Sequence, residues 1–204
     1  GALVAQARRM SADTAARVRI SPAKRTDLGN AQRLAARYAE VIRYVRATDR
    51  WHVWDGAKWA IDETGAIDRL ARDTERAMQR EAAAMASETE AQSEAKVDAA
   101  KWAVASESAA RLSAMIQLAR FEEGVAVTAQ EFDALPWELN TPNGIVDLKT
   151  GELCHHDPAC MHSQATLVPY LAHAAAPAWT RFTRLVLPDT AVRTDVQTLL
   201  GARL

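Results

Sequence analysis

The feature that most constrains the fold is a long run of helical periodicity between residues 65 and 123. Apolar residues recur there at three- and four-residue spacing in two stripes. The first stripe comprises Ile67, Leu70, Ala71, Thr74, Ala77, Met78 and Met85, and the second Trp102, Ala105, Ala109, Leu112, Met115, Ile116 and Ala119. Residues 87–95 between them are polar. We therefore expect a long helical hairpin connected there, or one continuous helix. Its Ala-rich stripe suits packing within the chain or against another copy.

The residues before this hairpin favour a small sheet. Residues 41–45, VIRYV, are β-prone, and two aromatic-rich runs flank Asp55-Gly56 within residues 50–62. Such a dipeptide favours the positive φ angles of a tight hairpin turn. Trp51, Trp54 and Trp59 lie in this hairpin. Tryptophans stack nucleobases in some proteins, but the favoured interpretation is the apolar core that a short hairpin must bury.

Capping signals predict further short helices. Thr26-Asp27 begins a helix that continues to Tyr38, and Thr128 caps a short acidic helix over residues 128–135. Pro188-Asp189 separates two helices near the end of the chain. The predicted fold class is α+β and mostly helical, with a long Ala-rich helical hairpin and two small β-hairpins. Residues 1–23 read as an arm or linker from an upstream module, and 24–204 as one domain, cut from a longer protein.

The stretch from Leu139 to His162, which includes the second hairpin, holds both cysteines and three of the five histidines. Asn143-Gly144 and Thr150-Gly151 are turn dipeptides, and the alternating residues between and after them predict strands at 145–149 and 152–156. Cys154 lies on the second strand. Asp157 then caps a short turn or helix in which Pro158 takes the first position.

Four residues of this segment are nominal metal ligands: Cys154, His156, Cys160 and His162. Their C-x-H-x3-C-x-H spacing matches no familiar zinc finger or ribbon. A Cys–His nucleophile needs an orienting third group and an oxyanion hole, and no nearby residue supplies either. The favoured interpretation is a small buried thiol and exposed histidines on a hairpin edge, without metal, cofactor or catalytic residue. A metalloenzyme using these four residues is the competing hypothesis.

Charge is distributed unevenly over the 204 residues. The first fifty carry eleven Lys and Arg against four Asp and Glu, a balance of +7, so the remainder carries −8 to give the net charge of −1. A basic end on an acidic body marks either a nucleic-acid contact or solvated helix surfaces. The candidate DNA-binding residues flank the first hairpin, and they are Lys24, Arg25, Arg43, Arg46 and Arg50.

Composition excludes several classes of protein. No apolar run approaches the roughly 20 residues of a membrane span, and two cysteines favour a reducing compartment, the cytoplasm. The sequence holds no G-x-x-x-x-G-K-[ST] phosphate loop, so we expect no usual ATP site. It also lacks the clustered carboxylates that hold the two metals of a polymerase or primase.

The order of several segments resembles one known family. TDLGNAQRL, RWHVWDGAKWAID, LNTPNGIVDLKTGELCHHDP, VPY, PAWTRF, and PD with LLGARL follow one another over residues 24–204. Together they are similar to the domain that precedes the helicase in phage and plasmid primase–helicases, and to the corresponding part of the poxvirus primase–helicase. Of the Cys- and His-containing stretch, only His-Asp-Pro at 156–158 fits the family pattern.

The resemblance implies a non-catalytic collar between a primase module and a superfamily III helicase of the AAA+ type. Such a collar supports helicase assembly and contacts single-stranded DNA during replication; a pure protein-interaction module is the alternative. The whole protein would be an ATP-dependent, ring-forming DNA helicase in a bacterial host cell, with ATP and Mg bound outside these residues. The implied partners are DNA, the downstream helicase and further copies, with the 204 residues alone a monomer or weak dimer.

Overall fold

The computed structural model describes residues 24–201, with side chains to residue 199. The chain divides into two compact units, and the boundary along the chain lies between Tyr170 and Leu171. The arm expected over residues 1–23 lies outside the described residues. Within them the fold is α+β and mostly helical, as predicted. None of the described helices is long and apolar enough to cross a membrane.

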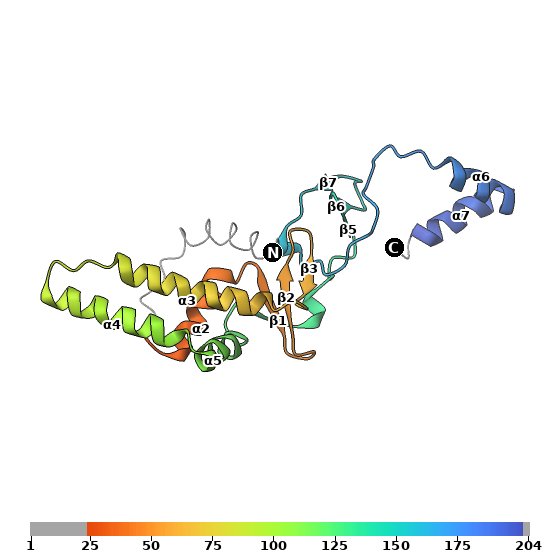
Figure 1. Ribbon diagram of the computed structural model, residues 1–204. Helices are drawn as coiled ribbons and strands as arrows, with labels where there is room; N and C mark the ends of the chain where they lie inside the picture. The colour runs from red at the N-terminus through yellow and green to blue at the C-terminus, as the bar shows by residue number, and fades with distance from the viewer. Residues whose placement is uncertain (1–23, 202–204) are drawn as a thin grey trace. The chain divides into compact units, whose positions relative to one another are not determined.

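The first unit combines helices with two small sheets (Figure 1). Its helices are α2 (Asp27–Tyr38), α3 (Ala66–Ala84), α4 (Glu90–Ser106) and α5 (Ala109–Ala119), with 3₁₀ turns η1 (Ala129–Glu131) and η2 (Pro158–Cys160). Its strands are β1 (Ile42–Val45), β2 (Arg50–Trp54), β3 (Trp59–Ile61), β4 (Ala126–Val127), β5 (Glu138–Thr141), β6 (Gly144–Asp147) and β7 (Leu153–Cys154).

The four-stranded sheet has the order β3-β2-β1-β4. β2 and β3 form the antiparallel hairpin predicted from the aromatic-rich runs. β1, from the β-prone residues 41–45, pairs antiparallel with β2, and β4 joins the edge in parallel to β1. Asp55 shapes the β2–β3 turn, because its carboxylate accepts hydrogen bonds from the backbone N–H groups of Ala57 and Lys58, both at 2.8 Å. Thr26 caps α2 as predicted by accepting a bond from the Gly29 N–H.

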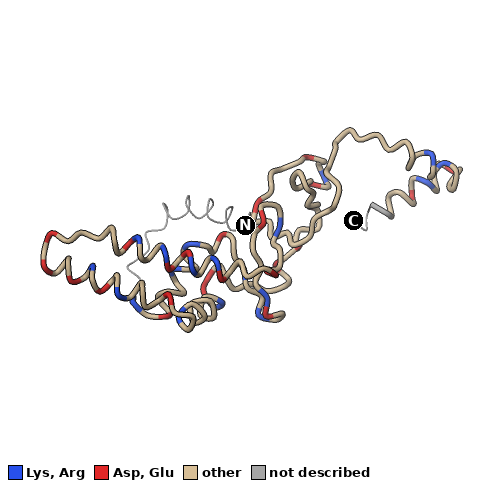
Figure 2. Tube along the Cα trace, viewed as in Figure 1, with Lys and Arg blue, Asp and Glu red and all other residues tan. Residues whose placement is uncertain are grey.

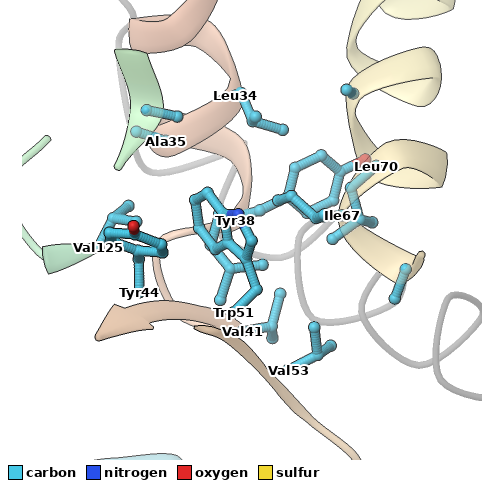
Figure 3. Close-up of a cluster of buried hydrophobic side chains, with 14 of the residues drawn as sticks. Leu34, Ala35, Tyr38, Val41, Tyr44, Trp51, Val53, Ile67, Leu70 and Val125 are labelled. Carbon is cyan, nitrogen blue, oxygen red and sulfur yellow. The ribbon is translucent and has the colours of Figure 1, made fainter. Parts of the chain in front are cut away.

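One face of this sheet packs on α2, α3 and α5 and forms the main core (Figure 3). Tyr38 lies between the sheet and the two neighbouring helices, and its hydroxyl donates to Asp73 at 2.6 Å. Trp51 reaches the same core from β2 and contacts Tyr44, with ring centroids 5.1 Å apart. Burial of these aromatic and branched side chains is the main stabilisation of the first unit.

The long helical hairpin is present, but its boundaries differ from the prediction. Residues 87–95 are mostly helical, because α4 begins at Glu90 behind a capping box formed by Thr89 and Gln92. The second arm also breaks after Ser106, and Ser108 caps a separate helix, α5, by accepting from the Arg111 N–H. The stripe starting at Trp102 therefore spans two helices. Capping competes with helix continuation at such polar residues.

A buried polar network joins α2 to α4. Asn30 is fully buried; its amide donates to the Ser106 hydroxyl at 3.0 Å, and its carbonyl accepts from the Trp102 indole at 3.1 Å. Because a buried amide without partners is costly, the network favours one register of α4 on α2. The rest of α4 is largely exposed.

The second sheet has the order β5-β6-β7 and is antiparallel. The predicted pairing of the strands around Thr150-Gly151 is present, and Asp157 caps η2 with Pro158 at its first position. The β5 strand was not expected. Gly144 has a φ of +149°, and an added Cβ would lie 2.3 Å from the carbonyl oxygen of Cys154. This position therefore requires glycine.

Hydrogen bonds fix the end of the first unit to this sheet. The Asn143 side chain accepts from the Tyr170 N–H at 2.8 Å and donates to the Tyr170 carbonyl at 2.9 Å. The Tyr170 hydroxyl donates to the Gly151 carbonyl at 3.1 Å. Both turn dipeptides of the hairpin thus help to hold Tyr170 in place.

The second unit contains the two terminal helices predicted from the sequence, α6 (Pro177–Val186) and α7 (Thr190–Gly201). Asp189 forms the break between them and accepts from the N–H groups of Ala191 and Val192. The apolar residues of α6 are exposed, among them Leu185 at 81% and Phe182 at 55%.

Candidate functional site

The tryptophans of the first hairpin are core residues. Trp51, Trp54 and Trp59 are 8%, 2% and 1% exposed, which confirms the packing interpretation over nucleobase stacking. Register places Trp51 on the helix-facing side of the sheet and the pair Trp54–Trp59 on the opposite side. Stacking partners for a ligand must therefore come from other residues.

The face of the sheet opposite the helices is covered by Arg43 and by Phe132. Phe132 contacts the rings of His52 and Trp59, with centroids 4.8 and 6.4 Å away. The Arg43 guanidinium lies 4.4 Å from the Trp59 ring centroid and donates to the carbonyls of Ala39 and Ile42. Burial lowers the pKa of Arg43. This candidate DNA-binding arginine is thus half-buried and bonded to its own chain.

The other candidates at the start of α2 differ in their availability. The Arg25 guanidinium donates to the Ala95 carbonyl at 3.0 Å and lies 3.8 Å from the Asp98 carboxylate, linking α2 to α4. Lys24 is exposed. The five candidates therefore do not form one cluster of equivalent cations.

Arg46 and Arg50 flank the β1–β2 turn and are both exposed. Arg46 lies over the ring of Phe121, 5.7 Å from its centroid, and Phe121 itself is 63% exposed. Arg120, at the end of α5, contacts the same turn, because it donates to the Asp49 carboxylate at 3.0 Å. Figure 2 shows Lys and Arg interspersed with Asp and Glu along the helices, so no helix face of one sign is apparent there.

A pocket of about 380 Å³ opens beside the same turn. Its lining residues come from the sheet face, the turn and the loops that cover them: Val45, Thr48, Arg50, His52, Ile61, Ala129, Phe132, Asp133 and Ser163. Two stacked rings, His52 and Phe132, form part of the wall. Burial lowers the pKa of His52, so its imidazole is neutral at pH 7. The pocket therefore combines aromatic rings with the guanidinium of Arg50 and the carboxylate of Asp133, so its polar lining carries both signs of charge.

A second group of functional side chains lies between β5 and the loop after η2. Glu138, Cys160 and His162 place a carboxylate oxygen, a thiol sulfur and an imidazole nitrogen within 4.8 Å of one another. The Nε2 atom of His162 is 2.9 Å from Oε2 of Glu138. Among the described residues no other Cys, His, Asp or Glu joins this group at that spacing. Cys154 and His156, the remaining nominal ligands, lie outside it.

The burial expected for this segment was wrong. Neither thiol is fully buried as expected, since Cys154 is exposed and Cys160 half-buried, whereas His162, expected to be exposed, is buried at 4% exposure. The reason is that β7 is an edge strand with both residues exposed, while the His162 carbonyl accepts from the Trp59 N–H at 2.8 Å. His156 is half-buried, with its Nε2 atom 2.8 Å from the Thr141 carbonyl oxygen.

The Cys160 thiol is unsuited to nucleophilic catalysis. Burial and the neighbouring Glu138 carboxylate raise its pKa to about 11, so it is protonated at pH 7. A catalytic cysteine needs the opposite, an environment that stabilises the thiolate. Sequence reasoning missed Glu138 as a neighbour because it precedes Cys160 by more than twenty residues and no local spacing signals it.

Comparison with known proteins now places the chain. The family model described as D5 N terminal like matches residues 31–188, so the chain belongs to that family. Its members are the non-catalytic N-terminal domains of phage and viral primase–helicase proteins, which confirms the resemblance seen in the sequence. No curated protein matches the chain.

Proposed function

We propose that this domain contacts single-stranded DNA through the turn surface, defined as Arg46, Arg50 and Phe121 together with the pocket walls His52 and Phe132. The observation that carries the proposal is the exposed Arg46–Phe121 pair together with Arg50, which flanks the same turn as Arg46 and lines the pocket with His52 and Phe132. Proteins that bind single strands combine cations for the phosphates with aromatic rings on which bases stack.

The contacts within the protein narrow the candidate set. Arg25 and Arg43 already donate to backbone carbonyls, whereas Arg50 lines the pocket and Arg46 is exposed over the ring of Phe121. If two phosphates are neutralised, the logarithm of affinity falls against the logarithm of salt concentration with a slope of about −1.5. Recruitment of Lys24 as a third contact steepens the slope to about −2.

The test is fluorescence anisotropy of a labelled oligothymidine with the 204-residue protein between 50 and 200 mM salt. We expect the double variant Arg46→Gln/Arg50→Gln to bind about tenfold or more weakly, since each charge-assisted contact contributes at least about 1 kcal/mol. Phe121→Ala removes a stacking platform that contributes about 1–3 kcal/mol per base.

The matched control is Arg76→Gln/Arg80→Gln, which removes two exposed charges from α3 and leaves the turn surface intact. We expect its affinity to stay within about twofold of the unmodified protein. If both double variants bind equally weakly, the effect is one of net charge and not of the turn surface, which would contradict the proposal. Absence of binding at 50 mM salt would also contradict it.

A second candidate function is protein interaction, which the exposed apolar residues of the second unit favour. Trp179, Phe182, Leu185 and Val186 are exposed on α6, while in α4 the exposed large apolar residues are two valines, Val97 and Val104. Exposed apolar faces of this kind mark binding surfaces. In the whole protein, which the family relationship supports as an ATP-dependent replicative helicase, such a face suits helicase assembly.

Analytical ultracentrifugation separates the two functions. Phe182→Glu/Leu185→Glu should abolish any association with the helicase domain without changing DNA affinity. Arg46→Gln/Arg50→Gln should do the reverse. A variant that alters both measurements equally would contradict a division of labour between the two units.

A further inference from the structure

We propose that Glu138, Cys160 and His162 form a binding site for a divalent zinc-type metal ion. Three chemically different ligand atoms already lie within 4.8 Å of one another. Zn–N and Zn–O bonds of about 2.1 Å and Zn–S bonds of about 2.3 Å place tetrahedral ligands roughly 3.5 Å apart. Metal binding would therefore require these atoms to approach one another by up to about 1.3 Å.

The loop that carries Cys160 and His162 is held in place before any metal binds. Met161 between them has left-handed dihedrals, φ 55° and ψ 30°, which turn the chain so that its two neighbours reach Glu138 together. Its carbonyl accepts from the Asp133 N–H at 3.1 Å. Trp59 fixes both ends of the loop, donating from its indole to Pro158 and from its backbone to His162. Such preorganisation lowers the entropy lost on binding.

The carboxylate of Asp133 lies near the second ring nitrogen of His162. The Nδ1 atom of His162 is 3.9 Å from Oδ1 of Asp133, on the side of the ring opposite Glu138. Asp133 is itself held by the N–H groups of Ser163 and Gln164 and by the Ser163 hydroxyl. Histidines that bind metals commonly have a carboxylate at the other ring nitrogen, which fixes the tautomer and the ring orientation.

The ligand set indicates the type of ion. A thiolate and an imidazole together favour borderline metals such as Zn²⁺ over Mg²⁺ or Ca²⁺, which prefer oxygen ligands. On binding, Cys160 loses its thiol proton to solvent, Glu138 coordinates as a carboxylate and His162 as a neutral imidazole. Three protein ligands leave the fourth tetrahedral position to water. The ion would join the start of β5 to the loop after η2.

The proposal differs from the competing metal hypothesis drawn from the sequence. That hypothesis used Cys154 and His156, of which the first is exposed on β7 and the second lies against the Thr141 carbonyl. The present set replaces both with Glu138. The two hypotheses therefore agree that Cys160 binds the metal and differ at Cys154, which only the hypothesis drawn from the sequence requires.

The experiment uses the 204-residue protein, stripped with a chelator and titrated with Zn²⁺ against a chromophoric competitor. Titration with Co²⁺ in parallel reports thiolate coordination through its charge-transfer absorption. We expect one equivalent bound, a cobalt–thiolate band, and a higher melting temperature with zinc. Cys160→Ser should lose all three, and the matched control Cys154→Ser should keep them.

Two further variants refine the test. Glu138→Gln should weaken zinc binding at least tenfold while the cobalt–thiolate band survives at higher cobalt concentration. Asp133→Asn should weaken it by about 10- to 100-fold, the usual effect of removing an outer carboxylate. Circular dichroism of each metal-free variant confirms its fold. Less than a tenth of an equivalent of metal in the unmodified protein, or loss of binding in Cys154→Ser with retention in Cys160→Ser, would overturn the proposal.

Discussion

The two sheets of the first unit are held in place by different forces. The four-stranded sheet has Ile42, Val53 and Trp51 in the main core and Trp54 and Trp59 buried on its other face. The β5-β6-β7 sheet buries only two apolar side chains from its strands, Ile145 and Val146. Apolar burial thus positions the first sheet, whereas the second depends on polar side chains bonded to backbone groups.

Asn140 illustrates the polar mode of the second sheet. It is 3% exposed, and its amide donates to the carbonyls of Ala57 at 2.9 Å and Gln164 at 3.0 Å. Thr141 donates to the Gly144 carbonyl in the neighbouring turn. Glu138, Cys160 and His162 therefore lie in the region that polar hydrogen bonds, rather than apolar packing, hold in place.

The largest effect is expected from Trp59→Ala, because this residue belongs to both regions. Its ring is buried in the first sheet, and its indole donates to the Pro158 carbonyl, a bond that the substitution removes, whereas the backbone bond to His162 is retained. We expect a loss of about 3–5 kcal/mol in the free energy of unfolding, measured by urea denaturation. Trp137→Ala, at a 55% exposed tryptophan, should change it by less than about 1 kcal/mol. Similar losses in both variants would contradict this account of the core.

A smaller effect is expected from Asn140→Ala, which removes only hydrogen bonds that hold the second sheet. Two carbonyls lose their donor, so we expect about 1–3 kcal/mol. Hydrogen exchange should show the loss concentrated in β5, β6 and the β2–β3 turn. Gln164→Ala keeps the accepting carbonyl and removes an exposed side chain, and it should stay within about 0.5 kcal/mol. Uniform loss of protection across α2 and α3 would argue against separate modes of stabilisation.

The smallest effect is expected from Tyr38→Phe, and it depends on pH. Burial and the hydrogen bond to Asp73 raise the pKa of Tyr38 to about 12. The folded pKa exceeds the ordinary value of 10, so this stabilisation is complete below pH 10 and lost as the pH rises toward 12. Tyr38→Phe should therefore be less stable by about 0.5–1.5 kcal/mol at pH 8. The difference should shrink above pH 10 and change sign as the pH approaches 12, because two pKa units correspond to about 2.7 kcal/mol; a constant difference in urea midpoints would contradict it.

The parts of the fold that apolar packing holds in place were predicted well from the sequence, whereas the parts held by polar side chains were predicted poorly. The Thr26 cap, the Asp55-Gly56 hairpin and the core tryptophans follow from periodicity and turn chemistry, which are local. The break between α4 and α5 was missed because Ala-rich helical spacing continues across Ser108, and tertiary packing decides whether that residue caps.

The candidate sites depended on contacts that no local pattern encodes. Arg43 and Arg50 look equivalent in sequence, but one covers Trp59 and the other lines the pocket. Glu138 lies near Cys160 and His162, whose loop is held in part by the indole bond from Trp59 to the Pro158 carbonyl, 99 residues apart in the sequence. Long-range packing of this kind must be observed in three dimensions.

The fixation of Tyr170 has a practical consequence for dissecting the molecule. Its amide, its carbonyl and its hydroxyl are all bonded to the turns of the second sheet, while residues 171–176 that follow are exposed. A protease should therefore cleave readily within residues 171–176, just after this tyrosine. An expression boundary placed at the same peptide bond would divide the polypeptide without severing any of these bonds.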